Sequence, residues 1–237
     1  MESITNHIFF DLDNTLWDFD KNSHKALLQL CTEFDFDNKL NTDFESFHKF
    51  YLKRNEELWH LYYFNKIEKS ELRYLRFYDS FKNFGFDDIN FSKQISEAYI
   101  NIAPLSTELK PGCIETLEVL HKKFPLHVIT NGFTEIQHIK IDSCGLRKYF
   151  GNIIISEQYN STKPNIEIFR VAEKLASTQK EKCVMIGDSI ISDIEGAVGA
   201  GWKAIHYNEK DSIAKRDLRD LRDYREIRDL RELKIMF

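Results

Sequence analysis

The chain lacks the features that mark disulfide-bonded, zinc-binding and membrane-spanning proteins. Its 4 cysteines are widely spaced and form no C-x-x-C pair, so we expect reduced thiols and no thiolate zinc site. Its 8 histidines form no H-x-H or H-E-x-x-H pattern, which argues against transition-metal chemistry. No stretch approaches the roughly 18 apolar residues of a membrane span, and no signal-like segment begins the sequence. These absences predict a soluble, cytoplasmic protein.

An excess of positive charge is also lacking. The 33 Lys and Arg residues stand against 38 Asp and Glu residues, which gives a net charge of -5. Such a chain has no general field that attracts a nucleic acid polymer, so any anionic ligand must be held locally. Its 237 residues are enough for one large domain, or for a core domain with a smaller one. We expect a monomer or a weak dimer.

A short apolar run followed by two acids is the most informative stretch of the sequence. Ile8, Phe9 and Phe10 read as a strand buried on both faces of a parallel sheet. Asp11 and Asp13 then project from one tight turn at the carboxyl end of that strand, where open α/β sheets bind their ligands. Two acids there repel unless a cation joins them, which suits a magnesium-dependent phosphoryl-transfer site. An acidic surface turn is the alternative, while a calcium loop is excluded because its required glycine and glutamate are missing.

The order of apolar patterns predicts two parts. From about 18 to 105 apolar positions recur at helical spacing, and this stretch reads as a helical block. Beyond it, helices and strands alternate, which predicts a doubly wound parallel sheet of the α/β class. The expected strands are 126–129, 153–155, 183–186 and 203–207, and the expected helices are 114–122, 135–143, 166–175 and 194–200. We therefore predict a Rossmann-like core over 1–16 and 108–237 and an inserted helical cap over 17–107, which could act as a lid.

Two further patterns carry structural expectations. The aromatic residues Trp59, Tyr62 and Tyr63 lie at helical spacing, and we expect them mainly to pack helices together. The segment 216–233 repeats an Arg-acid-apolar triplet. Because a period of three does not match the 3.6 residues of an α-helical turn, we expect a solvated charged segment. It has room for an edge strand over 224–227 before a last helix.

Polar residues follow the ends of several predicted strands, and together they resemble the four motifs of the haloacid dehalogenase (HAD) superfamily of phosphatases. The matching stretches are D-L-D-N-T at 11–15, T-N-G at 130–132, K-P at 163–164, and G-D-S at 187–189 with Asp193. The resemblance spans essentially the whole chain. It implies a HAD core domain with a cap and a phosphatase activity.

The resemblance also implies roles for the first two acids. Asp11 would be the nucleophile, which attacks phosphorus and gives an acyl phosphate that water later hydrolyses. Asp13 would be the general acid that protonates the leaving oxygen, and then the base that activates the water. Relatives that remove halogen from carbon lack the second Asp, because a halide needs no proton. Asp13 therefore argues against dehalogenation.

The same resemblance implies a magnesium site. Its ligands would be the Asp11 carboxylate, the Asp13 backbone carbonyl and Asp188, since Mg²⁺ prefers octahedral oxygen coordination. Asp193 resembles the second acid of the last motif, which orients a metal-bound water or Lys163. The expected cofactor is thus Mg²⁺.

The resemblance further implies which residues hold the phosphate oxygens. The Thr130 hydroxyl and the backbone amides of Asn131 and Gly132 would donate hydrogen bonds, and Lys163 would supply a balancing cation. Relatives often have a glycine three residues before this lysine, where this chain has Asn160. Because Asn tolerates left-handed backbone geometry, we expect the loop to keep its shape.

The insertion after the first motif resembles the cap of a branch that contains phosphoglycolate phosphatases, β-phosphoglucomutases and nucleotidases. Within it, the stretches W-D-F at 17–19, N-E-E-L-W at 55–59 and R-Y-L-R-F at 73–77 look like those of pyrimidine 5'-nucleotidases. The implied substrate is a nucleoside monophosphate. Another phosphatase of a sugar phosphate or phosphoglycolate, a mutase, and a non-enzymatic phosphate-binding protein are the alternatives.

Three residues are candidates for contact with that substrate. Phe19 could stack on a base, and Asn55 and Arg76 could bind sugar or base edges. Packing within the cap is the alternative role for each.

Overall fold

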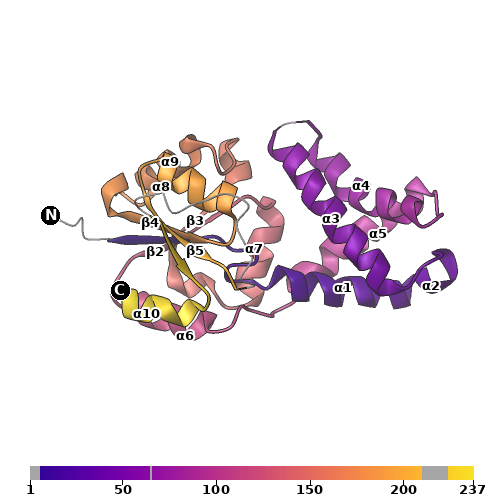
Figure 1. Ribbon diagram of the computed structural model, residues 1–237, viewed down its shortest axis with the longest axis horizontal. Coiled ribbons are helices and arrows are strands. Elements are labelled where there is room, and N and C mark those ends of the chain that lie inside the picture. The colour runs from indigo at the N-terminus through magenta and orange to yellow at the C-terminus, as the bar shows by residue number, and fades with distance from the viewer. Residues whose placement is uncertain (1–5, 65, 210–223) are drawn as a thin grey trace. The chain divides into compact units, whose positions relative to one another are not determined.

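The computed structural model describes residues 6–64, 66–209 and 224–237, and within them the predicted α/β fold is confirmed. Six strands form one fully parallel sheet in the order β3-β2-β1-β4-β5-β6 (Figure 1). Their bounds are β1 His7–Phe10, β2 Leu126–Thr130, β3 Phe150–Ile155, β4 Cys183–Gly187, β5 Lys203–Tyr207 and β6 Tyr224–Ile227. The first strand lies in the middle of the sheet, so residues that follow it sit between the ends of β2 and β4.

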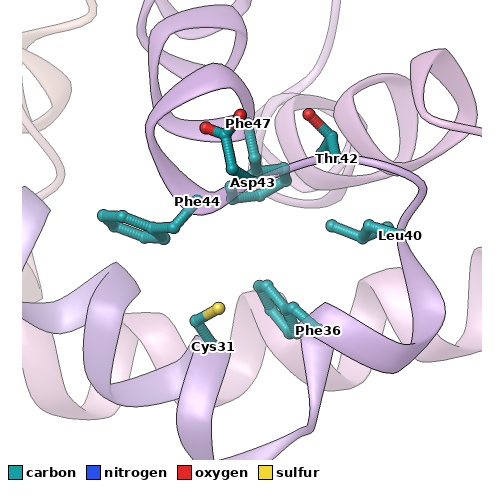
Figure 2. Close-up of a pocket in the computed structure, with 7 residues that line it drawn as sticks. All are labelled: Cys31, Phe36, Leu40, Thr42, Asp43, Phe44 and Phe47. Carbon is teal, nitrogen blue, oxygen red and sulfur yellow. The ribbon is translucent and has the colours of Figure 1, made fainter.

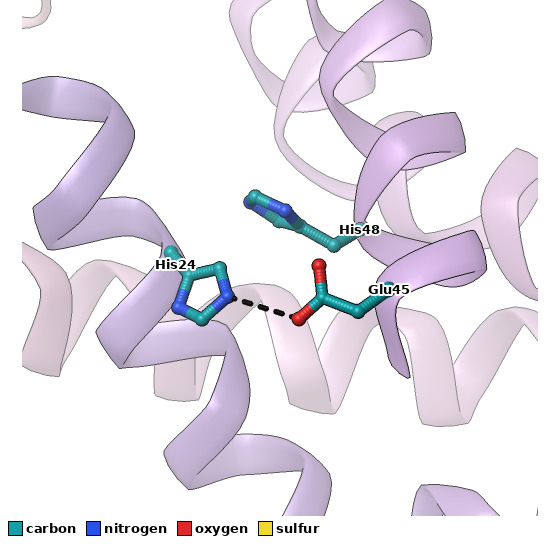
Figure 3. A group of neighbouring side chains, drawn as sticks. All are labelled: His24, Glu45 and His48. Atoms are coloured by element: carbon teal, nitrogen blue, oxygen red, sulfur yellow. Dashed lines mark hydrogen bonds and ion pairs between the residues drawn. The ribbon is translucent and has the colours of Figure 1, made fainter. Parts of the chain in front are cut away.

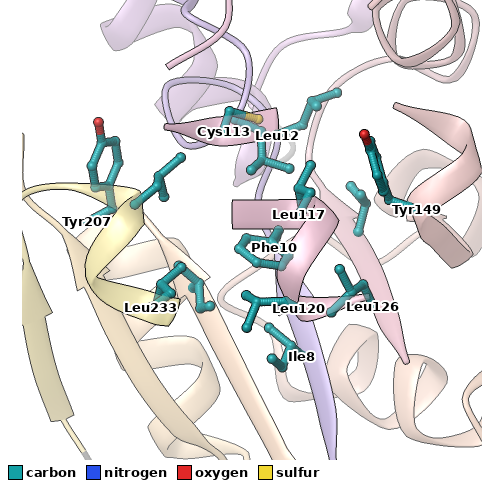
Figure 4. Close-up of a cluster of buried hydrophobic side chains, with 14 of the residues drawn as sticks. Ile8, Phe10, Leu12, Cys113, Leu117, Leu120, Leu126, Tyr149, Tyr207 and Leu233 are labelled. Carbon is teal, nitrogen blue, oxygen red and sulfur yellow. The ribbon is translucent and has the colours of Figure 1, made fainter. Parts of the chain in front are cut away.

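Helices cover both faces of this sheet. α6 (Cys113–Leu120), α7 (Thr134–Ser143) and α10 (Leu233–Met236) pack on one face, and α8 (Ile166–Leu175) and α9 (Gly196–Gly199) on the other. Phe10 belongs to the first apolar cluster and Phe9 to the second, because successive side chains of a strand point to opposite faces. Figure 4 shows the first cluster, in which side chains of α6 and α10 close over β1.

The helix predicted over 194–200 differs from the observed structure. A π-helical turn spans Ile190–Glu195, and α9 occupies only the four residues that follow. The Ser189 carbonyl accepts hydrogen bonds from the amides of Asp193 (2.9 Å) and Ile194 (3.2 Å), which widens the turn. Wide turns of this kind are frequent at functional sites, and here one carries Asp193.

The chain divides into two compact units, one of Met1–Phe19 with Thr107–Phe237 and the other of Asp20–Ser106. The second unit is helical, with α1 Phe19–Glu33, α2 Phe36–Lys39, α3 Phe44–Tyr63, α4 Lys69–Asn83 and α5 Ile89–Ile102. Its interior is rich in aromatic side chains, among them Phe47, Tyr51 and Phe77. Side-chain caps fix helix starts, since Asp43 accepts from the Ser46 amide (2.8 Å) at α3.

The aromatic residues Trp59, Tyr62 and Tyr63 lie near the end of α3. All three are partly exposed, the Trp59 ring centroid lies 5.7 Å from each of the other two, and none belongs to the buried apolar cluster of the helical unit. That they mainly pack helices together stays a prediction.

The triplet segment behaves differently from the prediction where the structure describes it. The edge strand is confirmed as β6, and Ile227, Leu230 and Leu233 are buried in the first apolar cluster, so this part is not a solvated segment. The reason is that a 3₁₀ turn covers Leu230–Glu232, and three residues per turn place Leu230 and Leu233 on the same face. The triplets over 216–223 lie outside the described residues.

Among the helices of the described residues, none combines the length and the apolar character that crossing a membrane requires.

Candidate active site

The carboxyl ends of the central strands bring the predicted motifs together around one lysine. Asp11 directly follows β1, and its Oδ1 accepts a hydrogen bond from Lys163 Nζ at 2.6 Å. The same Nζ donates to Asp193 Oδ1 at 2.6 Å and to the Ile129 carbonyl at 2.8 Å. Lys163 is only 1% exposed, so both ion pairs are shielded from water.

The aim of Lys163 is fixed by a side chain from the end of β2. Asn131 Oδ1 accepts from the Lys163 amide at 2.8 Å, and Asn131 Nδ2 donates to the Lys163 carbonyl at 2.9 Å. This double hydrogen bond joins two segments that are 32 residues apart. Asn160 adopts the left-handed region (φ 49°), as predicted for the position where relatives often have glycine.

Asp193 is held by the turn after β4. Its Oδ2 accepts from the Ser189 amide at 3.0 Å while its Oδ1 binds Lys163. The carboxylate packs so closely on Gly187 that a Cβ there would lie 2.1 Å from Asp193 Oδ2. Only glycine therefore fits at the end of β4, and it lets this acid approach the lysine.

Asp188 completes a group of three acids. One carboxylate oxygen each of Asp11, Asp188 and Asp193 lies within 4.8 Å of the others. Thr15 Oγ1 donates to Asp188 Oδ1 at 3.2 Å, and His206 Nε2 donates to the Asp188 carbonyl at 3.0 Å. The first and last predicted motifs thus meet, and their oxygen ligands suit a hard divalent cation.

The pKa values of these side chains are shifted by burial and by the closeness of their charges. Burial raises the pKa of Asp11 well above its usual range, and Asp193 and Asp188 raise it further against the opposing effect of Lys163. Burial, with Asp193, raises the pKa of Asp188 to about 7. Burial disfavours the charged form of Lys163, but its two acid partners outweigh this and raise its pKa. One ammonium group is too little positive charge for three carboxylates, so a bound divalent cation would relieve their repulsion.

Asp13 is held by two residues that the sequence reasoning missed. Lys140 Nζ forms an ion pair with Asp13 Oδ1 at 2.5 Å, and Gln137 Nε2 donates to Asp13 Oδ2 at 2.9 Å. Both lie on α7, and both are at most 5% exposed. Their spacing of three residues on the predicted helix 135–143 was the available signal, because it places them on one face.

The same glutamine connects Asp13 to the second motif. Gln137 Nε2 also donates to Thr130 Oγ1 at 2.6 Å, and the Gly132 amide lies 3.4 Å from that oxygen. A Cβ at Gly132 would be 2.4 Å from Gln137 Cδ, so any larger residue there would force the Gln137 side chain to shift. Whether Thr130 and the amides of Asn131 and Gly132 bind phosphate stays a prediction.

The three predicted substrate residues fall in different places. Phe19 is partly exposed in the sheet-containing unit, 6.2 Å from the Trp17 ring and 5.8 Å from Lys140 Nζ. Asn55 and Arg76 lie in the helical unit, where Arg76 Nη1 donates to Asn55 Oδ1 at 3.3 Å. Both are about 95% buried, and the guanidinium packs on the ring of Tyr99 at 4.8 Å. The structure thus brings Asn55 and Arg76 together in one polar pair.

Comparisons with known proteins agree with this architecture. The family model for haloacid dehalogenase-like hydrolases matches residues 5–201. The chain is similar to pyrimidine 5'-nucleotidase PynA of Streptococcus pneumoniae (34% identity over 85% of this chain and 83% of that protein). It is also similar to pyrimidine 5'-nucleotidase YjjG of Escherichia coli (31%, 86% and 88%). The crystal structure of the HAD-hydrolase YfnB from Bacillus subtilis bound to magnesium, which reveals interdomain movement, gives a TM-score of 0.86 at 25% identity, with 98% of each chain covered.

Proposed function

The chain belongs to the haloacid dehalogenase-like hydrolases and is a phosphatase of that family, and on this premise we propose a specific reaction. We propose that it hydrolyses nucleoside 5'-monophosphates with the help of Mg²⁺, through a phosphoryl group carried by Asp11. The observation that carries the proposal is the buried contact of Asp11 with Lys163, beside an Asp13 that α7 holds in place. This arrangement pairs a fixed nucleophile with a separately fixed acid.

The two acids divide the reaction between them. A carboxylate oxygen of Asp11 attacks phosphorus, and the bond from phosphorus to the ester oxygen breaks. Asp13 gives its proton to that oxygen, so the nucleoside leaves as an alcohol. Water then attacks the phosphorus, Asp13 takes its proton, and inorganic phosphate leaves with Asp11 restored.

Cationic and neutral donors stabilise the charge that the transfer spreads over the phosphoryl oxygens. Lys163 supplies a positive charge beside Asp11, and the Thr130 hydroxyl with the backbone amides of Asn131 and Gly132 supplies hydrogen bonds. The Asn131 side chain has a different task, because both of its polar atoms already bind the Lys163 backbone. It positions the lysine.

The residues present fit a magnesium ion. Asp11, Asp188 and the Asp13 carbonyl would hold it, with Asp193 as an orienting acid, and the crowding of three carboxylates around one lysine favours an added cation. When bound, the ion offsets the repulsion between the anionic nucleophile and the anionic phosphate. The magnesium named for the YfnB structure supports the same cofactor.

The substrate class rests on the two nucleotidases to which the chain is similar. Phe19 offers a partly exposed aromatic ring beside Lys140 and Asp13, which suits stacking on a base. Asn55 and Arg76 bind each other in this structure, so we assign them to holding the helical unit together unless a substrate separates them. A phosphatase of sugar phosphates or phosphoglycolate is the second candidate, because its core residues would be the same.

A substrate screen tests the proposal. Purified protein is assayed with nucleoside monophosphates, sugar phosphates and phosphoglycolate, with Mg²⁺ and with a chelator. We expect pyrimidine nucleoside monophosphates to give the highest kcat/KM, and the chelator to remove turnover. Preference for phosphoglycolate or a sugar phosphate would overturn the nucleotidase assignment while leaving the phosphatase assignment intact.

The nucleophile is tested separately. We expect Asp11→Asn to lower turnover of an aryl phosphate on the order of 10³-fold or more, because the amide cannot form the acyl phosphate. Asp142→Asn is the matched control, since this exposed residue binds Arg147 in the same unit. Equal turnover of the two variants would refute the role of Asp11.

A further inference from the structure

The helical unit contains a second group of metal-ligating side chains, far apart in the sequence. His24 comes from α1, and Glu45 and His48 come from the first turns of α3. Figure 3 shows the three side chains converging between the two helices, with His24 Nε2 3.4 Å from Glu45 Oε1. One nitrogen or oxygen of each residue lies within 4.8 Å of the others.

The positions of these residues along their helices explain why the side chains converge. Glu45 and His48 are three residues apart, so they occupy one face of α3. A Glu and a His at that spacing, facing a neighbouring helix, form the half-site that helical bundles use to hold metal ions. His24 lies across from this face and supplies the third donor from the other helix.

The distances are close to those of a tetrahedral zinc site. Zinc binds nitrogen and oxygen at about 2.0 to 2.2 Å, so two donors of one ion lie roughly 3.4 Å apart. The separation of His24 Nε2 and Glu45 Oε1 already has this value. A ligand atom of His48 lies within 4.8 Å of one ligand atom each of His24 and Glu45, so side-chain rotation has to shorten this separation for all three to bind one ion.

One atom in the group has no hydrogen-bond partner. His48 is 9% exposed, and its Nε2 is buried without a hydrogen bond. A buried polar atom left in this way costs free energy and calls for an explanation. The Phe44 ring lies parallel to the His48 ring at 5.6 Å and edge-on to the His24 ring at 5.1 Å, so it holds both imidazoles in place.

We propose that His24, Glu45 and His48 bind a divalent transition-metal ion of the Zn²⁺ type and thereby clip α1 to the start of α3. Two imidazoles and one carboxylate suit zinc better than magnesium, whose preferred ligands are oxygens. The three protein donors leave a fourth position for water. This site is separate from the proposed reaction, and it would hold its ion whether or not that reaction is assigned correctly.

An ion fits this region better than an organic ligand does. The neighbouring hollow is lined by Cys31, Phe36, Leu40, Thr42, Asp43, Phe44 and Phe47 (Figure 2). Its empty volume is about 160 Å³, open solvent included, whereas pockets for organic ligands start at roughly 300 Å³. Phe44 lines this hollow and also contacts both histidines.

Calorimetric titration of the full chain with Zn²⁺ tests the proposal. All proteins carry Asp188→Asn, so that zinc binding at the carboxylate group is weakened. In that background we compare His24→Gln, Glu45→Gln and His48→Gln with His60→Gln, a matched control on the exposed face of α3. We expect one equivalent of Zn²⁺ to bind, with affinity at least ten-fold weaker in each of the three ligand variants and unchanged in the control, since the loss of even an outer partner of a metal ligand costs about 10- to 100-fold.

Two results would overturn the proposal. One is the same zinc affinity in Glu45→Gln and His60→Gln; the other is no binding at about 100 µM Zn²⁺. Glu45 is exposed, so its variant keeps the fold, and circular dichroism checks that helicity is unchanged. With the native Asp188 restored, Glu45→Gln should hydrolyse its substrate with Mg²⁺ as the parent does, which separates this site from a failure of the proposed function.

Discussion

Within the part of the chain that the structure describes, two groups of potential metal ligands are built in opposite ways. Asp11, Asp188 and Asp193 follow the ends of neighbouring parallel strands, whereas His24, Glu45 and His48 project from the faces of two helices. The first group offers only oxygen atoms and is largely buried, and the buried Lys163 forms ion pairs with two of its acids. The second is mainly nitrogen, and its carboxylate is exposed.

The electrostatics differ in sign as well. Burial raises the pKa values of Asp11 and Asp188, so their charge is costly without a cation. Burial and the neighbouring His24 lower the pKa of His48, so that ring is stable in its neutral form. The charged acids at the ends of the strands thus depend on a partner ion, whereas the neutral histidine of the helical group is stable without one. Three experiments test how the buried acids depend on their partners, and the last of them compares the two groups directly.

Removing the buried lysine should have the largest effect. In Lys163→Met the side chains of Asp11 and Asp193 lose their shared ammonium partner, and breaking a buried pair in this way costs about 3 to 5 kcal/mol. We expect the free energy of unfolding, measured in urea without metal, to fall by this amount, and turnover to disappear. Lys122→Met, at an exposed lysine of the same unit, is the control and should change neither quantity.

An unchanged stability of Lys163→Met would show that the carboxylate group tolerates its charge as easily as the helical group does. Added Mg²⁺ should recover part of the lost stability, because the ion supplies positive charge to the same acids. Lack of that recovery would argue against a cation site at Asp11 and Asp188.

The sheet edge was accessible from the sequence because its geometry is repetitive. Each apolar strand ends where an acid, a threonine or a glycine begins, and parallel strands carry those ends to one edge, so Asp11, Thr130 and Asp188 could be grouped. Lys163 comes from a loop, and only the resemblance to a known family placed it. The strands and most core helices followed from the same alternation, apart from the π-helical turn that aims Asp193.

The residues that were missed depend on rotation about a helix axis. Lys140 and Gln137 lie inside a predicted helix, but no local sequence pattern indicated which face of that helix contacts Asp13. The helical group was harder still, because His24 and Glu45 are 21 residues apart and meet only through the packing of α1 on α3. Glu45 and His48 form a local Glu-x-x-His pair, but the lack of H-x-H and H-E-x-x-H patterns argued against transition metals, and only the packed helices bring His24 to that pair.

The second substitution tests the positioning of Asp13. In Lys140→Met the Asp13 carboxylate keeps Gln137 and loses its ion pair, and the contact of the Lys140 ammonium with the Trp17 ring, 4.3 Å from the ring centroid, is lost as well. We expect kcat to fall about 10- to 100-fold with a smaller change in KM, because a misplaced acid slows proton transfer more than binding. Kinetics with a nitrophenyl ester, whose leaving group needs little help from an acid, should show a smaller loss.

An equal loss for both kinds of leaving group would mean that Lys140 does not act through Asp13. Lys148→Met serves as the control, since this exposed lysine of the same unit places its Nζ 4.9 Å from the centroid of the Tyr149 ring. Its kinetics should match those of the parent chain.

The smallest expected effect concerns pH, and it separates the two groups by sign. Because the pKa of Asp188 is raised to about 7 in the folded chain, its contribution to stability is present at low pH and is lost as pH rises through 7. The pKa of His48 is lowered, so its contribution is present above the ordinary histidine pKa and is lost on acidification. The free energy of unfolding is measured in urea with a chelator. As pH rises from 5.5 to 8, the stability of Asp188→Asn relative to the parent should increase by about 1 to 2 kcal/mol. The stability of His48→Gln relative to the parent should increase only as the pH is lowered into the acid range. If both variants gained stability over the same pH range, the contrast between the two groups would fail. Adding Mg²⁺ at pH 8 should stabilise the parent more than Asp188→Asn, because only the parent keeps all of the acids that hold the ion.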